Sequence, residues 1–479
     1  MGPFLGIVKL TIKTALRSNV FQLLLLVLLF CITFIPTTIA GDGTAQGYIQ
    51  VSLKYSLAAI GFILSLSSIW LGCFMMSRDT ETYQIHMVVS KSVSRTTVWL
   101  GKWFGIVLIH LSLLLLSAAT IYFIVSYQYH RQDFSEKERV RIQNEVMVAR
   151  RVYYPKMPNM DNIAKQELTR RVEMNKKIGK EVDESSASMN KMLQDIKREV
   201  IGNYSQIPFN SMREWSYEGL PINYDGPVFL RFRLYVNKIG GNDQRLSNGL
   251  WIAGFPVPEE ANSEPAKNVF EQKSAGKQKY KFVPQALSNG PEQIMTGEFH
   301  ERVLDSRFIS PDGMMLTAFQ NSDPQRAQLF FQPADGPKIL ISASNFTDNY
   351  FRAVLVLFLQ LIIMAGLGCA AASVLSMPMA IFVVISYVIA GSFSIILSGS
   401  SYISGVADHI GYYMGNILLL VIIPMQAFEI THFVSGGELI EFKLIGTIFL
   451  KYFILRALPL FILGIWLYNR REMGLVIRK

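Results

Sequence analysis

Long apolar runs alternate with charged segments along this chain of 479 residues. Three apolar runs come early and three come late, and a long charged segment separates the two groups. The six runs cover roughly residues 21–40, 53–75, 103–127, 351–373, 379–397 and 445–468. Each is close to or above the roughly 20 residues that a helix needs to cross a hydrocarbon core of about 30 Å. The pattern predicts a polytopic α-helical membrane protein with six transmembrane helices.

A further apolar stretch, Ile410–Val434, is interrupted by Pro424. If it crossed the membrane, the basic tail beginning at Asn469-Arg470-Arg471 would lie outside the cytoplasm, against the positive-inside rule. We therefore expect a re-entrant or interfacial segment on the outer side, with both chain ends in the cytoplasm. In the fourth span, the small residues of 365–373 predict close packing against another helix.

The charged segment, Gln128–Tyr350, contains no run that could span, and the count of spans places it outside the cytoplasm. Its first part, 128–202, is rich in charge, and Pro155 and Pro158 divide it into two helical pieces. Apolar residues at helical spacing form narrow stripes on these helices: Leu168, Val172, Met189, Leu193, Ile196 and Val200. This pattern predicts a solvated helical stalk or a helical hairpin.

From residue 203 the apolar period becomes two. In Val228–Val236 the residues Leu230, Phe232, Leu234 and Val236 share one face. Further strands are expected at 250–255, 279–283, 314–319, 328–332 and 338–343, with turns at Ser247-Asn248-Gly249, 288–290, 310–313 and 334–337. Short strands with such turns predict an antiparallel β-sandwich.

Trp215, Tyr217 and Trp251 are the candidate contacts for an extracytoplasmic ligand, because exposed aromatic rings stack on sugars. The alternative is that they pack in the core of the sandwich, where aromatic residues are favoured. We expect four regions: an N-terminal membrane half at 1–127, the helical region at 128–202, the β-sandwich at 203–349 and a C-terminal membrane half at 350–479. Within the first, the basic and apolar residues of 4–19 predict an amphipathic surface helix.

The composition and the missing motifs argue against several classes of function. Half of the residues are hydrophobic, the mean hydropathy is +0.28 and the formal charge is +10. Much of the basic excess lies beside apolar runs, where topology and lipid headgroups account for it, so we expect no nucleic-acid partner. Neither the three cysteines nor the six histidines have metal-ligand spacing, and no phosphate-binding loop is present. We expect no metal, cofactor or catalytic residue in this chain, which is therefore not expected to be an enzyme.

The loop between the second and third runs, Met76–Phe104, contains four basic residues, whereas the loop 41–51 contains none. By the positive-inside rule it faces the cytoplasm. Thr80-Glu81-Thr82 can begin a helix, and apolar residues at helical spacing follow. We expect a short amphipathic helix at about 79–95 that offers its apolar face to a partner. The alternative is an ordinary cytoplasmic loop folded against its own spans.

Three segments carry a resemblance to a known family. The first comprises Glu81, Thr82, the run Val88-Val89-Ser90-Lys91-Ser92-Val93-Ser94-Arg95 and Gly101-Lys102; the others are Leu375-Ser376-Met377-Pro378-Met379-Ala380 and the stretch from Ile422 to Gly437. They resemble loops of ABC-2 type transporter permease subunits, among them the nitrous-oxide-reductase maturation and gliding-motility permeases. The resemblance covers both membrane halves but not Gln128–Tyr350.

The resemblance implies a coupling helix that docks into a separate ATPase subunit through Glu81, Val88, Val89, Ser90, Val93 and Arg95. It implies that two permeases, identical or related, pair with an ATPase dimer in the bacterial inner membrane, and that ATP and Mg²⁺ are bound only by that partner. The output is export or a mechanical signal through the extracytoplasmic domain. A different function remains open, namely a membrane-anchored binding or scaffold protein with no ATPase partner. The presence of an ATPase gene beside this one would separate the two.

The last span carries Lys451 and Arg456. A charge within a span is by default a functional hypothesis, so Arg456 is a candidate contact for an anionic lipid or a substrate. Alternatively, a long basic side chain can reach the membrane interface without any such role.

Overall fold

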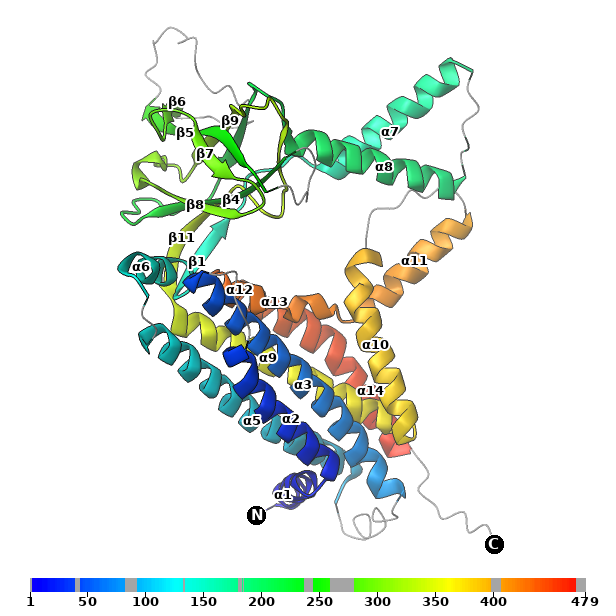
Figure 1. Ribbon diagram of the computed structural model, residues 1–479. Helices are drawn as coiled ribbons and strands as arrows, with labels where there is room; N and C mark the ends of the chain where they lie inside the picture. The colour runs from blue at the N-terminus through cyan, green and yellow to red at the C-terminus, as the bar shows by residue number, and fades with distance from the viewer. Residues whose placement is uncertain are drawn as a thin grey trace. The chain divides into compact units, whose positions relative to one another are not determined.

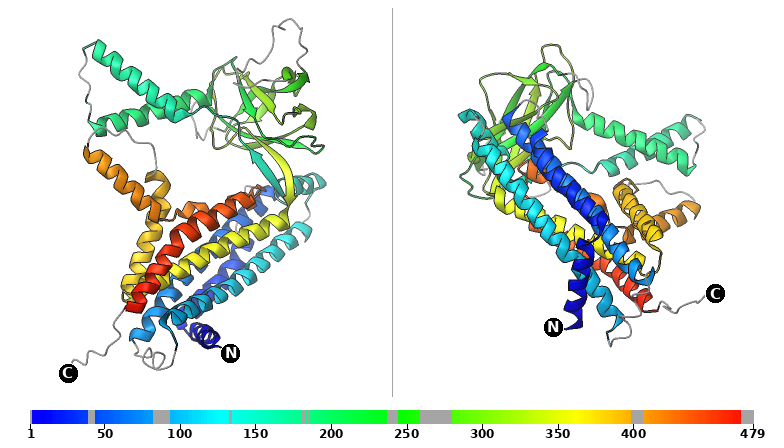
Figure 2. Two further views of the ribbon diagram at one scale, coloured as in Figure 1. Left: turned by 180° about the vertical axis from the view of Figure 1, so that it is seen from behind. Right: turned by 60° about the horizontal axis from the view of Figure 1, so that its bottom comes forward.

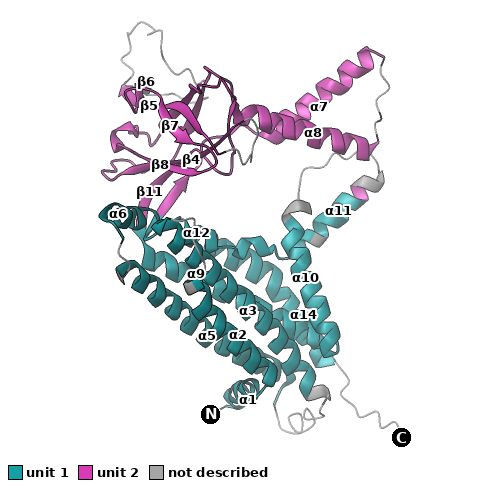
Figure 3. Ribbon diagram, in the orientation of Figure 1, with its two compact units in different colours: residues 1–149, 344–399, 411–479 teal, residues 150–343, 400–410 magenta. Residues whose placement is uncertain are grey.

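The computed structural model describes residues 2–38, 44–81, 93–131, 134–179, 183, 185–236, 244–258, 280–397 and 406–470. The chain forms two compact units, which Figure 3 distinguishes by colour. The helical unit comprises residues 1–149, 344–399 and 411–479, and the insertion unit comprises residues 150–343 and 400–410.

The helical unit is built almost entirely of helices (Figure 1). Its α-helices are α1 (Pro3–Leu16), α2 (Asn19–Thr38), α3 (Ala45–Glu81), α5 (Arg95–Arg131), α6 (Glu136–Glu145), α9 (Phe346–Ala372), α10 (Met377–Leu397), most of α11 (Val406–Val421), α12 (Thr431–Ser435), α13 (Phe442–Thr447) and α14 (Leu458–Arg470). The described residues of this unit also form a 3-10 helix, η2 (Met425–Phe428), and a π-helix, η3 (Ile448–Ala457).

Seven segments of the described chain are long and apolar enough to cross a membrane, which makes this a polytopic membrane protein by length and composition. Six of them correspond to the six expected spans, and the seventh, His409–Ser435, covers the stretch expected to be re-entrant. That stretch is not one helix, because α11 ends at Val421 and η2 and α12 follow separately. Pro424 lacks the N–H that would continue the helix. The break is therefore observed, and the count of six spans stays a prediction.

The centre of the helical unit is the crossing of α3 with α9, and the left view in Figure 2 shows α9, in yellow, running through the middle of this unit. A Cβ atom at Gly72 would lie 2.9 Å from the carbonyl oxygen of Ala365, and one at Gly368 would lie 2.7 Å from that of Ile69. Ser68 Oγ donates a hydrogen bond to Leu361 O at 3.1 Å across the same interface. The close packing predicted from the small residues of the fourth span is confirmed.

Helix α6 belongs to the helical unit, although the sequence assigned it to the extracytoplasmic helical region. Its Ile142 and the following Val146 are buried in the core of the helical unit, and Glu145 accepts a hydrogen bond from Gln46 of α3. Because these apolar residues pack against the spans, the units divide at 149/150 and 343/344, not at the expected 127/128 and 349/350.

The insertion unit contains two β-sheets. Its strands are β1 (Val148–Tyr153), β2 (Gln206–Ile207), β3 (Met212–Tyr217), β4 (Val228–Val236), β5 (Leu246–Pro258), β6 (Tyr280–Ala286), β7 (Glu292–Met295), β8 (Phe299–Leu304), β9 (Met315–Asn321), β10 (Leu329–Phe331) and β11 (Lys338–Asn345). One sheet has the order β1-β11-β4-β10-β2, with β8 also paired to β4, and the other has the order β3-β9-β5-β6, with β7 also paired to β5. The pairings of β4 with β8, β10 and β11 are antiparallel, as are those of β5 with its three neighbours.

The two sheets enclose one apolar core, as the predicted sandwich requires. On β4, Leu230, Phe232, Leu234 and Val236 are all buried in it, which confirms the predicted face. The turn expected at Ser247-Asn248-Gly249 is wrong, because these residues lie inside β5. A Cβ atom at Gly249 would lie 2.0 Å from the Phe319 ring. The glycine therefore leaves room for that ring within the strand and does not form a turn.

Helices α7 (Met160–Lys177) and α8 (Ser186–Ser205) form a hairpin with a small core of its own. Both follow Pro158, so the expected division into two helical pieces at Pro155 and Pro158 is wrong, and strand β1 lies before Pro155 in the region expected to be helical. That core consists of Ala164, Leu168, Met189, Leu193 and Ile196. Across the hairpin, Arg171 Nη2 lies 2.9 Å from Glu199 Oε2. The narrow apolar stripes read from the sequence are therefore the contact surface between the two helices.

Candidate functional site

The predicted coupling stretch lies mostly outside the described residues, which include neither Val88, Val89 and Ser90 nor the side chain of Glu81. The structure corrects one part of the prediction, because α3 continues to Glu81. Thr80 and Glu81 therefore end a long helix and do not begin a short one. No Gly or Pro interrupts residues 73–81, and Arg78 lies over the Phe74 ring at 5.4 Å, one turn earlier on the same helix.

The described residues resume at Val93, whose side chain is half-buried. The next residue, Ser94, is the N-cap of α5. The backbone N–H of Thr97 donates to Ser94 Oγ at 3.1 Å, which satisfies one of the free donors of the first turn. The cap makes Arg95 the first residue of a long helix, so a separate short helix does not extend to the expected residue 95. Of the six predicted docking residues, only Val93 and Arg95 have described side chains.

Arg95 joins the start of α5 to the end of α14. Its Nη1 donates to the carbonyl oxygen of Asn469 at 3.0 Å, and Asn469 Nδ2 donates to Thr96 Oγ1 at 3.1 Å. A cation is favourable at a helix C-terminus, where the last carbonyl groups have no partner in the helix. This side chain, predicted to dock a partner, thus also holds two spans together.

Trp99 joins α5 to the end of α9. It is fully buried, and its Nε1 donates to Ser373 Oγ at 3.0 Å. Ser373 Oγ in turn donates to Cys369 O at 2.8 Å. Ser373 comes two residues before Leu375, where the second family-like loop begins. The structure therefore brings together two loops that the sequence matched separately.

Gly101 and Lys102 make contact with two different helices. Cβ atoms at Gly101 and Gly105 would lie 2.9 Å from Ile7 and Thr11, so the two glycines form the surface on which α1 packs. Lys102 is buried, and its Nζ donates to Met75 O of α3 at 2.5 Å. The glycine spacing of four, which is typical of close helix contacts in membranes, was a signal that sequence reasoning did not use. We call Arg95, Trp99, Gly101 and Lys102 the loop base.

A second group of residues surrounds the break after α11. Arg456 Nη1 donates to Ile422 O, and Tyr387 OH donates to Val421 O at 2.8 Å. The N–H of Ile423 donates to Tyr387 OH at 3.0 Å. A helix end leaves backbone groups without hydrogen-bond partners, and such groups are costly in a bilayer. The bonds to Arg456 and Tyr387 supply partners for backbone groups at this break. Arg456 thus has a partner within the chain, and its contact with a lipid or substrate stays a prediction.

Arg456 lies in the π-helix η3, and its guanidinium lies 5.4 Å from the centre of the Tyr452 ring. A cavity of about 310 Å³ begins one turn further along. It lies between α9, α10 and α14, and its lining is Leu367, Ala370, Ala371, Val383, Val384, Tyr387, Val421, Leu460, Leu463, Gly464 and Leu467. Tyr387 therefore faces both the cavity and the helix break. We call Tyr387, Arg456 and the carbonyl groups that they bind the helix-break site.

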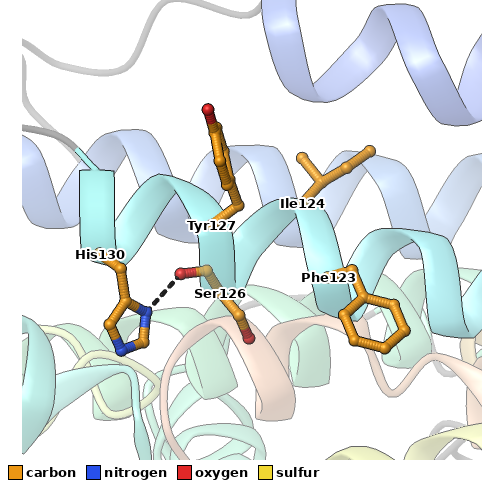
Figure 4. Close-up of a pocket in the computed structure, with 5 residues that line it drawn as sticks. All are labelled: Phe123, Ile124, Ser126, Tyr127 and His130. Atoms are coloured by element: carbon orange, nitrogen blue, oxygen red, sulfur yellow. Dashed lines mark hydrogen bonds between the residues drawn. The ribbon is translucent and has the colours of Figure 1, made fainter.

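A hollow on α5 is not a comparable site (Figure 4). Its lining, Phe123, Ile124, Ser126, Tyr127 and His130, comes from one helix, and His130 Nδ1 lies 2.7 Å from the carbonyl oxygen of its neighbour Ser126. Phe123 is 70% exposed and Tyr127 60%. Exposed apolar and aromatic side chains near the end of a spanning helix suit the bilayer and its interface.

Trp215, Tyr217 and Trp251, the predicted ligand contacts of the insertion, are buried in the sandwich core. The two indole rings lie 5.8 Å apart, and the Trp251 ring lies 4.7 Å from that of Phe232. Protein covers these rings, so we do not retain them as ligand contacts. The alternative that they pack in the core is confirmed. The sequence left both roles open because strand aromatics serve either as core or as binding surface, and only the packing of the second sheet separates the two.

Among the described residues, no group of three or more His, Cys, Asp or Glu side chains could hold a metal ion. Comparisons of the chain with protein families, curated proteins and solved structures found no match. The features of the chain that bear on its function are therefore the loop base, the helix-break site and the family-like loops.

Proposed function

We propose that the chain is the membrane-spanning permease subunit of an ABC-2 type transporter, and that a separate subunit hydrolyses ATP. The observation that carries the proposal is the hydrogen bond from Trp99 to Ser373, which joins residues 274 positions apart. It connects the two family-like loops, and Arg95 adds the end of α14 to the same group. A docking surface for a partner requires several loops at one end of the spans, and these contacts favour such an assembly.

The loop base suggests how a partner could move the spans. A force on residues 82–92 acts directly on the start of α5. From there the Arg95, Trp99 and Lys102 hydrogen bonds lead to α14, α9 and α3 respectively. The Trp99 and Lys102 bonds are buried, and breaking a polar link away from water costs more than breaking one in water. Helices α9 and α3 therefore tend to move with α5, whereas the exposed Arg95 bond is a weaker link to α14. ATP binding by the partner would then tilt several spans at once.

A movement of the spans would change the geometry of the helix-break site. Helix α14 begins where the π-helix ends, so a shift of α14 changes the position of Arg456 relative to Ile422. π-helical segments are rare and occur frequently at functional sites. Discontinuous helices beside a cavity are also where transporters bind their substrates. We therefore place the transport-linked change at this site.

A mechanical output is compatible with the same arrangement. Strand β11 ends at Asn345 and helix α9 begins at Phe346, so no linker residue separates the insertion from the fourth span. On the other side, α6 ends at Glu145 and β1 begins at Val148, which leaves only residues 146 and 147 between them. Short joints transmit a rotation better than flexible linkers do.

The test is a search for an ATPase gene beside this one, co-purification of the chain with the product of that gene, and then Val93→Asp. The proposal predicts a complex whose ATP hydrolysis no longer responds to the permease in Val93→Asp, because the change places a charge on the apolar docking face. Ser94→Asp is the matched control, since Asp keeps the helix cap and adds the same charge one residue later. If no ATPase co-purifies, the alternative of a membrane-anchored binding or scaffold protein is favoured. If both variants keep full coupling, the stretch is an ordinary loop.

A further inference from the structure

On the face of β4 that points away from the core, the buried aromatic residues Phe229 and Tyr235 alternate with the partly exposed Arg231 and Arg233. Residues 230, 232, 234 and 236 point into the core, so Phe229, Arg231, Arg233 and Tyr235 lie on the opposite face of the strand. In the neighbouring strand β8, Phe299 pairs with Arg233 and Glu301 pairs with Arg231. This face was not among the candidate sites that the sequence predicted.

One ring lies beneath two guanidinium groups. The Arg231 guanidinium lies 4.7 Å from the centre of the Phe299 ring, and the Arg233 guanidinium lies 5.3 Å from it. Arg233 also lies 5.1 Å from the Tyr235 ring. These cation–π contacts fix both arginines against the sheet. The Phe299 side chain is nevertheless 46% exposed, so an apolar surface remains open between two cations.

The carboxylates of this face are already engaged elsewhere. Glu301 accepts two hydrogen bonds from Arg150, at 2.8 and 3.0 Å, and lies 3.7 Å from Arg231 Nε. Asp335 accepts a hydrogen bond from Tyr235 OH at 2.5 Å. In the described part of the chain no carboxylate lies within 4.0 Å of Arg233, and no hydrogen bond occupies the Nη atoms of Arg231 or Arg233. The face thus has an uncompensated positive charge, centred on Arg233.

We propose that Arg231, Arg233 and Phe299 form a binding site for a polysaccharide that contains uronic acid units. Guanidinium groups bind carboxylates with paired hydrogen bonds, which supplies the contact for the acid group. The exposed Phe299 ring beside them offers a flat apolar surface to the C–H face of a sugar ring. A uronic acid sugar carries both features in one rigid unit. An acidic peptide carries its carboxylates on flexible side chains and has no such ring face.

Binding of a trimer of galacturonic acid to the intact, detergent-solubilised protein tests the proposal by calorimetry. The wild-type protein should bind this trimer and not a neutral glucose trimer, and binding should weaken as salt rises. Arg233→Gln should lower the affinity about tenfold or more, as expected for a lost charge-assisted contact. Phe299→Ala should lower it without changing the salt dependence.

Arg307→Gln is the matched control, because Arg307 also lies over an aromatic ring but has its own carboxylate partner, Asp305. Its affinity should stay within about twofold of the wild type, as for a substitution away from the site. Equal binding by Arg233→Gln and the wild type would overturn the site. Arg233-dependent binding of an acidic peptide without binding of the galacturonate trimer would overturn the ligand class.

Discussion

The ion pair between Arg150 and Glu301 leads to a sharp prediction about the stability of the insertion. The Arg150 side chain is 0% exposed and that of Glu301 is 11% exposed, and two hydrogen bonds join them. Glu301→Gln removes the negative charge from a pair whose guanidinium is fully buried. Removing one partner of such a pair typically costs about 3–5 kcal/mol, mostly because a charge remains buried and uncompensated.

A substitution of the other partner, Arg150, should destabilise the insertion less. Arg150→Met removes the buried cation, while Glu301 keeps Arg231 at 3.7 Å and some contact with water. We expect a cost of about 1–3 kcal/mol, as for a partly satisfied polar group. The double substitution Arg150→Met with Glu301→Gln should cost less than the sum of the two single changes, because no charge of the pair is then left behind.

Hydrogen exchange of the β4 and β8 amides in the intact protein measures this directly. Glu301→Gln should reduce their protection roughly a hundredfold to several thousandfold, since each factor of ten corresponds to about 1.4 kcal/mol. The control is Glu218→Gln, which removes an exposed pair with Lys156 at the same distance of 2.8 Å and side chains 63% and 47% exposed. Exposed pairs contribute about 0–1 kcal/mol. If the two substitutions have equal effects, burial does not decide the strength of this pair and the reasoning is wrong.

Three further predictions concern the packing, the acid stability and the topology. Gly72→Ala should lower the thermal stability of the solubilised protein by about 1–3 kcal/mol, because its Cβ would lie 2.9 Å from a backbone oxygen of α9; Gly446→Ala, where no atom lies within 4 Å, should not. The pKa of Asp323 is lowered: burial would raise it, but hydrogen bonds from Arg245, the Ala327 N–H and Ser247 outweigh burial. The stabilisation that the Asp323 carboxylate gives to the fold is therefore present above the unfolded pKa of about 3.9 and is lost as the pH falls through the lower folded pKa. The amides of β5 and β9 should lose protection from hydrogen exchange in that pH range. Asp323→Asn should abolish this loss of protection at acid pH. Cysteine labelling should find position 92 accessible from the cytoplasm and position 279 from outside, and the opposite pattern would refute the assigned orientation.

Local patterns in the sequence were sufficient wherever neighbouring residues determine the outcome. The period of two in Val228–Val236 identified both the strand and its buried face, and the helical stripes around Leu168 and Leu193 identified the hairpin contact. Runs of apolar residues located the membrane helices, and Pro424 marked the break in the segment at 410–434. In each case the signal lies within a few turns of helix or one strand, so no knowledge of distant residues is needed.

Only the tertiary structure decided which distant residues meet. The burial of Trp215 depends on the second sheet, and the pairing of Arg150 with Glu301 joins residues 151 positions apart. The same holds for Trp99 with Ser373, and for the assignment of α6 to the helical unit through Ile142. A charged or aromatic side chain has the same local pattern whether its partner is another residue, a ligand or water. Its role is set by the groups that the fold places around it, because burial and hydrogen bonding depend on all of the packed elements together.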